Sequence, residues 1–132
     1  MRRALLVGSL LLVSCSPPNF TSEGTLTIDG ANFRPQTCRV LTGSAGGIEL
    51  ENAMHSRLTL VAPPSQMDAN EQVSAAVSPK WLNAGETKDF DACGQLLMKG
   101  ESYHADGKRA VSGTISLACT GATGQLTFRG CF

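Results

Sequence analysis

The sequence lacks several features that would point directly to a function. Charged residues make up only 17% of it, and 11 Lys and Arg balance 11 Asp and Glu, so the formal net charge is zero. The basic residues are scattered, so we do not expect the concentrated positive surface of a nucleic-acid-binding protein. The apolar run over residues 4–13 is shorter than the roughly 20 residues that a membrane-spanning helix needs.

Motifs for catalysis are also missing. The stretch closest to a hydrolase nucleophile elbow, Thr42-Gly43-Ser44-Ala45-Gly46, has threonine where the first glycine belongs. The two histidines, His55 and His104, have no partner at the spacing of a catalytic or metal-binding motif, and we interpret both as solvent-exposed. We therefore predict that the protein is not an enzyme and that it needs no cofactor.

Two pairs of carboxylates occur at alternate positions of predicted strands. Glu49 with Glu51 and Asp89 with Asp91 each fall on one face, because successive side chains of a strand point to opposite sides. A calcium ion takes six or more oxygen ligands, and no loop here supplies a matching set. We interpret both pairs as solvent-facing side chains of amphipathic strands, and we predict no metal site.

The sequence does contain a distinctive leader in its first fifteen residues. Two arginines precede the apolar run over residues 4–13, which is the pattern of a secretory signal peptide. The run ends in Leu12-Val13-Ser14-Cys15, which resembles the lipobox of bacterial lipoproteins. That resemblance implies cleavage between Ser14 and Cys15 and attachment of lipid to the Cys15 thiol. The alternative is an ordinary secretory leader that happens to contain a cysteine.

The lipobox interpretation divides the chain into three parts. Residues 1–14 form the signal peptide, residues 15–24 the lipidated cysteine and a flexible tether, and residues 25–132 a single β-rich extracytoplasmic domain. The tether is expected to be extended and polar because it contains Pro17-Pro18 followed by small and polar residues. Ser16 resembles the outer-membrane sorting signal of many Gram-negative lipoproteins. We therefore predict a lipid-anchored protein of the bacterial cell envelope, at the outer membrane or cell surface.

If Cys15 carries lipid, an even number of cysteines is left to form disulfides. Of the five cysteines, Cys38, Cys93, Cys119 and Cys131 remain. An even number of cysteines in an oxidising compartment predicts two disulfides. Zinc is the competing interpretation, but no two of the four have the C-x2-C or similar spacing of a zinc site.

Four cysteines allow three pairings. A hairpin turn centred near Ala122 would place Cys131 six residues, about 20 Å, beyond the position opposite Cys119. Disulfide-bonded residues have Cα atoms within about 7 Å, so pairing these two cysteines needs a bulge or a different turn. The other two pairings both link an early strand to the last strands and remain open. Of these we favour Cys38–Cys131 with Cys93–Cys119.

Short alternating segments separated by turn residues predict an all-β fold. Turn signals include Asp29-Gly30 and Asp106-Gly107. The one predicted helix covers residues 65–77, with Pro79 ending it. We expect an antiparallel sandwich or barrel-like domain with at most one short helix, stapled by two disulfides. Strands are predicted over residues 25–28, 37–41, 48–51, 58–61, 88–93, 95–99, 103–105, 109–119 and 126–132.

The mature chain also resembles the small cell-wall lipoprotein antigens of mycobacteria. The likeness rests on Gly24-Thr25-Leu26-Thr27-Ile28-Asp29-Gly30, on Cys38 followed by a glycine-rich loop, and on Tyr103-His104-Ala105-Asp106-Gly107-Lys108 before a final cysteine. It implies a compact exported domain, with a disulfide from the early cysteine to the C-terminal one. Cys93 and Cys119 depart from the family pattern. The resemblance implies a surface location and no reaction.

The predicted function is that of a lipid-anchored envelope protein that displays a small β-domain in a structural or interaction role. Its predicted partners are the membrane, through the lipid on Cys15, and an unspecified protein or glycan. The alternative is a ligand-binding module for a glycan, lipid or small molecule. Trp81 and Tyr103 would be its contacts, because exposed aromatic rings can stack on ligands. A pocket lined by both would favour this alternative. The other interpretation of Trp81 is that it closes the edge of the core, which is the more common role of a single tryptophan.

Overall fold

The computed structural model of the chain describes residues 19–42, 46–63, 67–105 and 108–132. The described residues form strands and loops, which confirms the predicted all-β class, and they contain no helix that is long and apolar enough to cross a membrane. The strands are β1 (Thr21–Ile28), β2 (Ala31–Phe33), β3 (Thr37–Val40), β4 (Gly46–Glu51), β5 (Arg57–Ala62), β6 (Gln72–Asn83), β7 (Glu86–Asp89), β8 (Gly94–Ala105), β9 (Lys108–Cys119) and β10 (Ala122–Cys131).

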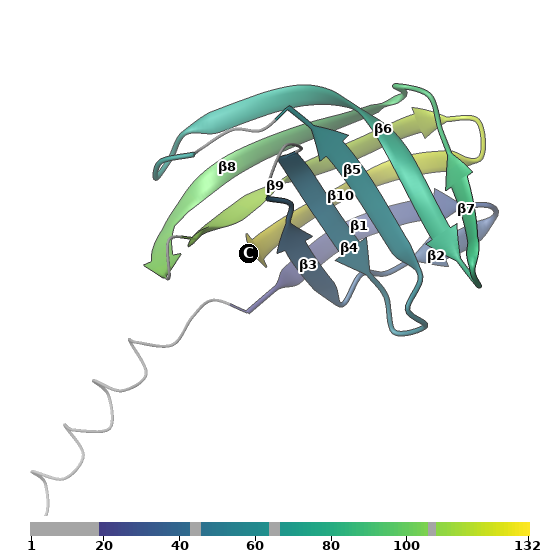
Figure 1. Ribbon diagram of the computed structural model, residues 1–132, viewed down its shortest axis with the longest axis horizontal. Helices are drawn as coiled ribbons and strands as arrows, with labels where there is room; N and C mark the ends of the chain where they lie inside the picture. Colours follow the sequence, from purple (N-terminus) through teal and green to yellow (C-terminus); the bar gives the residue numbers. More distant parts are fainter. Residues whose placement is uncertain (1–18, 43–45, 64–66, 106–107) are drawn as a thin grey trace, which may run out of the picture.

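All strand pairs are antiparallel, and the sheet curls so that its two halves face each other (Figure 1). In Figure 1, β3, β4 and β5 lie in front of β10 and β1. Strand β6 belongs to both layers, since Gln72–Val77 pair with β8 whereas Ser78–Leu82 pair with β5. The strand order is β2-β1-β10-β9-β8-β6-β5-β4-β3, with β7 added to β6.

An apolar core fills the space between the two layers. Alternate residues of most strands face inward, as with Leu58 and Leu60 in β5 and Leu126 and Phe128 in β10, whereas β7 is exposed throughout. Burying each side chain of this size stabilises the fold by about 1.5–3 kcal/mol. The largest fully buried side chains are Phe33, Phe128, Leu26, Ile28, Ile48, Leu50, Leu58, Leu60, Leu96, Ile115, Leu126 and Val77.

The helix predicted over residues 65–77 is wrong. Residues from Gln72 onward form β6, and the more buried side chains recur at every second position from Val73 to Trp81. A period of two is the pattern of a strand. The helix prediction instead placed residues three or four positions apart on one apolar face. Pro79 does not end an element. It lies inside β6 opposite Leu60, where its carbonyl oxygen accepts a hydrogen bond of 2.9 Å from the amide of Phe90.

The predicted tether is shorter than residues 15–24. Strand β1 begins at Thr21, and its first four residues pair with residues 126–129 of β10. These residues gave no strand signal because they are polar and end in Gly24, which has a φ of +100°. Gly24 is required there, since a Cβ atom would collide with the carbonyl oxygen of Gln125. Residues 15–18 of the predicted tether lie outside the described residues.

The disulfides are Cys38–Cys131 and Cys93–Cys119, the pairing that the sequence favoured. The β9–β10 turn lies earlier in the sequence than predicted, so Cys119 lies opposite Ala122. Cys119 is therefore even farther from Cys131 in this hairpin than the predicted turn would place it. The Cys38–Cys131 bond joins β3, at the end of the strand order, to the end of β10. The two layers of the sandwich are therefore linked covalently.

Candidate functional site

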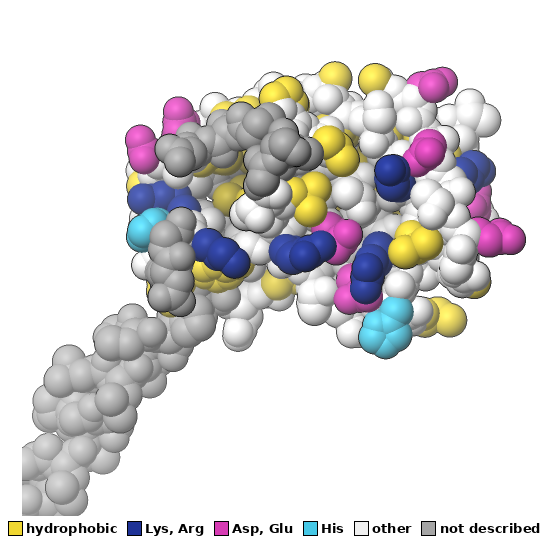
Figure 2. All heavy atoms as spheres, in the orientation of Figure 1, with side chains coloured by type: hydrophobic (Ala, Val, Ile, Leu, Met, Phe, Trp, Pro, Cys, Tyr) yellow, Lys and Arg dark blue, Asp and Glu magenta, His cyan; other side chains and the backbone are white. Residues whose placement is uncertain are grey.

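The outer face of β3, β4 and β5 carries a group of charged side chains in register across the strands. Arg39 lies opposite Glu49, and Glu51 lies opposite Arg57. These side chains point to solvent because the alternate residues of β4 face the core. Figure 2 shows Lys and Arg side chains interspersed with Asp and Glu on this side of the molecule. We call Arg39, Glu49, Glu51 and Arg57 the charged face.

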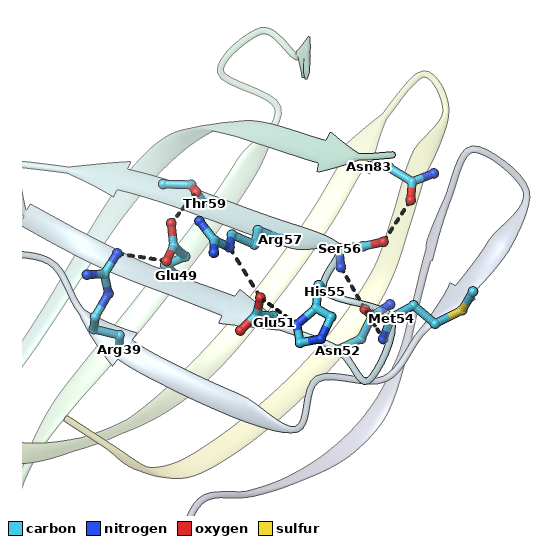
Figure 3. Close-up of polar contacts among 10 residues, drawn as sticks. All are labelled: Arg39, Glu49, Glu51, Asn52, Met54, His55, Ser56, Arg57, Thr59 and Asn83. Carbon is cyan, nitrogen blue, oxygen red and sulfur yellow. Dashed lines mark hydrogen bonds and ion pairs between the residues drawn. The ribbon is translucent and has the colours of Figure 1, made fainter. Parts of the chain in front are cut away.

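Both oxygens of the Glu49 carboxylate have donors on neighbouring strands (Figure 3). The Nη2 atom of Arg39 donates to Oε1 over 2.8 Å, and Oγ1 of Thr59 donates to Oε2 over 3.3 Å. The carboxylate therefore bridges β3 and β5. Exposed ion pairs of this kind contribute about 0–1 kcal/mol, so the contact orients side chains more than it stabilises the fold.

Glu51 contacts two side chains that follow it in the β4–β5 hairpin, one in the loop and one in β5. The Nε atom of Arg57 donates to its Oε2 over 3.3 Å, and Nδ1 of His55 lies 3.4 Å from the same oxygen. The loop that carries His55 is held by Asn52, whose Oδ1 accepts hydrogen bonds from the amides of Met54 (3.1 Å) and of Ser56 (2.9 Å) (Figure 3). His55 itself has a φ of +65°, a conformation that this loop imposes.

The charged face surrounds an open depression of about 290 Å³, which Thr37 and Cys38 also line. Two guanidinium groups and two carboxylates balance in charge and already pair with one another. A ligand or partner that binds there must exchange these ion pairs for its own. The depression is thus suited to hydrogen bonding with a polar or zwitterionic surface, and the four side chains form no nucleophile–base pair.

The Arg57→Gln variant is expected to raise the pKa of Glu51. The hydrogen bond from Arg57 has the largest effect and lowers that pKa. Desolvation by burial raises the pKa, and the hydrogen bond from His55 lowers it. A lowered pKa in the folded state means that ionised Glu51 stabilises the fold above its ordinary pKa. This contribution is lost as the pH falls through the lowered value. It is small, because Glu51 is in contact with water.

An NMR titration of the Glu51 carboxyl carbon measures the effect directly. Arg39→Gln is the matched control, since Arg39 pairs with Glu49 and not with Glu51. We expect the Glu51 pKa to rise in the Arg57 variant and to stay constant in the control. An unchanged pKa in both variants would show that the Arg57–Glu51 contact does not form in solution.

The two aromatic residues predicted as ligand contacts belong to separate aromatic pairs. Trp81 is only 7% exposed and packs edge-on against Phe33, with 5.3 Å between ring centroids. Tyr103 is half-buried against Phe132, with 5.5 Å between centroids. Neither ring lines the depression. The inward position of Trp81 in β6 agrees with the core alternative and disfavours Trp81 as a ligand contact.

The other predicted residues are placed as follows. His55 and His104 are both exposed, and His55 contacts Glu51. Asp89 ends β7, where its carboxylate lies 4.0 Å from Nζ of Lys80, whereas Asp91 follows the strand. Ser14 and Cys15 lie outside the described residues.

Sequence reasoning found Glu49 and Glu51 as outward-facing carboxylates but missed Arg39 and Arg57. The signal was available for Arg57, because a hairpin turn over residues 52–56 places it opposite Glu51. For Arg39 no such signal existed, since the length of the β3–β4 loop did not define its register.

No family model, curated protein or solved structure matches this chain. Within the described ranges, no group of three or more His, Cys, Asp or Glu side chains could hold a metal ion. Function is therefore inferred from the chain's own residues.

Proposed function

We propose that the protein is a lipid-anchored envelope protein whose β-domain serves as an interaction or structural module and not as an enzyme. The observation that carries this proposal is the use of cysteine. Cys38, Cys93, Cys119 and Cys131 are all disulfide-bonded. Cys15 is thus the one cysteine outside the two bridges, and it stands at the end of the lipobox-like leader.

The disulfides also support a location outside the cytoplasm. Disulfides persist in oxidising compartments such as the bacterial periplasm and cell surface, and they are rare in the cytosol. A secretory leader delivers a protein to those compartments. Two independent features of the chain, one in the leader and one in the folded domain, therefore agree on export.

A surface role is favoured over enclosure of a ligand. The space between the layers is filled by large apolar side chains, and Trp81 is one of them. Typical ligand pockets have volumes of about 300–1,000 Å³ and are mainly apolar. The depression on the charged face, at about 290 Å³, falls just below that range and is lined mainly by polar and charged residues. Recognition of a protein or glycan across the charged face fits these properties better.

The Cys15→Ala variant is expected to accumulate as unprocessed precursor. Lipoprotein processing requires the lipid on the cysteine before the leader is cut, so loss of the thiol blocks both steps. Immunoblotting of membrane fractions, with mass spectrometry of the purified protein, would show the retained leader. Globomycin, which inhibits the lipoprotein peptidase, should produce a precursor from the natural sequence as well.

Ser16→Ala is the matched control, because it changes the neighbouring residue and keeps the thiol. We expect this variant to be cleaved and lipidated normally. Normal cleavage of the Cys15→Ala variant would overturn the proposed anchor and would leave a secreted domain in its place.

A further inference from the structure

The distance between Cys15 and the folded domain limits how far the domain can stand from a membrane. Strand β1 begins at Thr21, only six residues after Cys15. An extended chain spans at most about 3.3–3.6 Å per residue, so these six residues reach about 20 Å. If Cys15 carries lipid, as proposed above, the end of the domain at Thr21 must lie close to the lipid surface.

Three basic side chains lie at that end of the sandwich. Strand β1 begins beside the end of β10, and β8 ends next to the start of β9 (Figure 1). Arg129 lies opposite Thr21, and Lys108 with Arg109 begin β9. Figure 2 shows basic side chains and a histidine over the end of β8 and the start of β9. His104, in β8, lies opposite Arg109.

Two of these cations are available to bind an external anion. Lys108 and Arg129 are exposed, and within the described residues neither forms an ion pair. Arg109 is half-buried, and its Nη1 donates to the carbonyl oxygen of Glu101 over 2.8 Å. The Glu101 carboxylate accepts a hydrogen bond of 2.8 Å from the amide of Gly130.

Aromatic side chains lie at the same end. Tyr103, near the end of β8, packs edge-on against Phe132, the last residue of the chain, and both are half-buried. Phe20, just before β1, is also half-buried and packs against the core. Tyrosine is enriched at membrane–water interfaces because its ring is apolar and its hydroxyl is polar. The turns Asp29-Gly30 and Thr120-Gly121 lie at the far ends of these strands.

We propose that the end of the domain formed by Tyr103, Lys108, Arg129 and Phe132 rests on an anionic phospholipid surface, as a second contact beside the lipid on Cys15. This inference depends on the proposed anchor for its geometry. Stable membrane attachment commonly combines an acyl chain with a second signal such as a basic patch. Basic residues attract anionic lipid only within about a Debye length of the surface, about 8 Å at physiological ionic strength. A linker that reaches at most about 20 Å allows these residues to come within that range.

Vesicle binding by a mature chain with Cys15→Ser tests the surface without the lipid. We expect tighter binding to vesicles of phosphatidylcholine with phosphatidylglycerol than to phosphatidylcholine alone, with the preference lost at high salt. The double variant Lys108→Gln/Arg129→Gln should weaken binding to the anionic vesicles by roughly 25-fold, since each basic residue near such a surface contributes about fivefold. The preference for anionic vesicles supports the proposal, and its absence overturns it.

Lys80→Gln/Lys88→Gln is the matched control, because it removes the same charge from β6 and β7, away from this end. We expect the control to bind within about twofold of the unmodified chain, because its substitutions lie outside the patch. Equal loss in the two double variants would mean that net charge alone drives binding and would overturn the proposed surface. Circular dichroism of each variant confirms that it is folded.

The lipidated protein in nanodiscs tests the orientation itself. Paramagnetic lipids should broaden the amide signals of residues 103–104, 108–109 and 129–132 more than those of Asp29-Gly30 and Thr120-Gly121. Equal broadening at the two ends, or none at either, would overturn the inference while Cys15 still carried lipid. Mass spectrometry that found no lipid on Cys15 would instead refute the anchor, and the vesicle comparison would still report on the surface.

Discussion

Replacing Cys38 and Cys131 by alanine is expected to destabilise the domain more than replacing Cys93 and Cys119. In the chain-entropy description, a disulfide stabilises a fold by restricting the unfolded chain, and the effect grows with the separation of its cysteines. The Cys38–Cys131 bond spans 93 residues and corresponds to about 4.7 kcal/mol. The Cys93–Cys119 bond spans 26 residues and corresponds to about 3.5 kcal/mol.

The positions of the two disulfides in the fold point in the same direction. Cys38–Cys131 joins strands from opposite ends of the curled sheet, where a backbone hydrogen bond from Val40 to Phe132 accompanies it. The Cys93–Cys119 bond instead lies where β8 and β9 already pair along their length. Loss of the first bond therefore releases β3 from β10, whereas loss of the second leaves its neighbourhood paired.

Urea unfolding under non-reducing conditions, followed by circular dichroism, measures both costs. We expect the Cys38/Cys131 variant to lose about 1 kcal/mol more than the other, with a total loss in the range of about 2–5 kcal/mol. Hydrogen exchange of the β3 amides should accelerate in this variant alone. A larger loss in the Cys93/Cys119 variant would contradict the view that the long-range bond holds the layers together.

Trp81→Ala is expected to destabilise the domain by about 3–5 kcal/mol, the usual cost of truncating a buried aromatic side chain. Trp81 fills the core beside Phe33, and the removal of its ring leaves a cavity. Trp81→Phe should cost much less. Among the described residues, the buried Nε1 atom of Trp81 has no hydrogen-bond partner, so phenylalanine removes an uncompensated polar group along with part of the ring.

Chemical unfolding of both variants, monitored by far-ultraviolet circular dichroism, gives the two costs. A loss below 1 kcal/mol for Trp81→Ala would contradict the core assignment and would restore Trp81 as a candidate surface contact. A cost for Trp81→Phe as large as that for alanine would mean that the indole N–H makes a stabilising bond. The pair of variants thus separates the packing of the ring from the polarity of its nitrogen.

The fold class could be predicted from the sequence where one strand face is polar and the other apolar. The segments around Ile48 and Leu58 alternate cleanly, and a short polar loop joins them, so both the strands and their hairpin were found. The hairpin from β8 to β9 was found from Asp106-Gly107, and the pairing of Ala105 with Lys108 confirms it. In both cases adjacent residues determine the structure.

Errors arose where partners distant in the sequence decide the structure. Thr21–Gly24 are extended because β10 pairs with them, and their own sequence contains no apolar alternation. Strand β6 was mistaken for a helix because its first half is only partly buried and rich in alanine. Its pairing with β8 and β5 cannot be inferred from the sequence of this segment alone. The choice between a core position and a ligand contact for Trp81 stayed open for the same reason, since its inward direction follows from that strand.

The candidate site was predictable only in part. The outward carboxylates Glu49 and Glu51 follow from the period of their strand, whereas the ion pair with Arg39 required the register of β3 against β4. The disulfide pairing was narrowed by hairpin geometry and favoured correctly. Contacts between strands that are distant in the sequence could thus be identified only from the tertiary structure.

The intact mass of the protein, purified from bacterial membranes without reduction, reports on the lipid anchor and on both disulfides at once. We expect a chain that begins at Cys15, carries the added mass of acyl chains on that residue, and lacks the four hydrogens lost in two disulfides. Alkylation before analysis should add nothing, because no free thiol remains. A chain with an unmodified Cys15 thiol, or with any reactive thiol among the other four cysteines, would contradict this expectation.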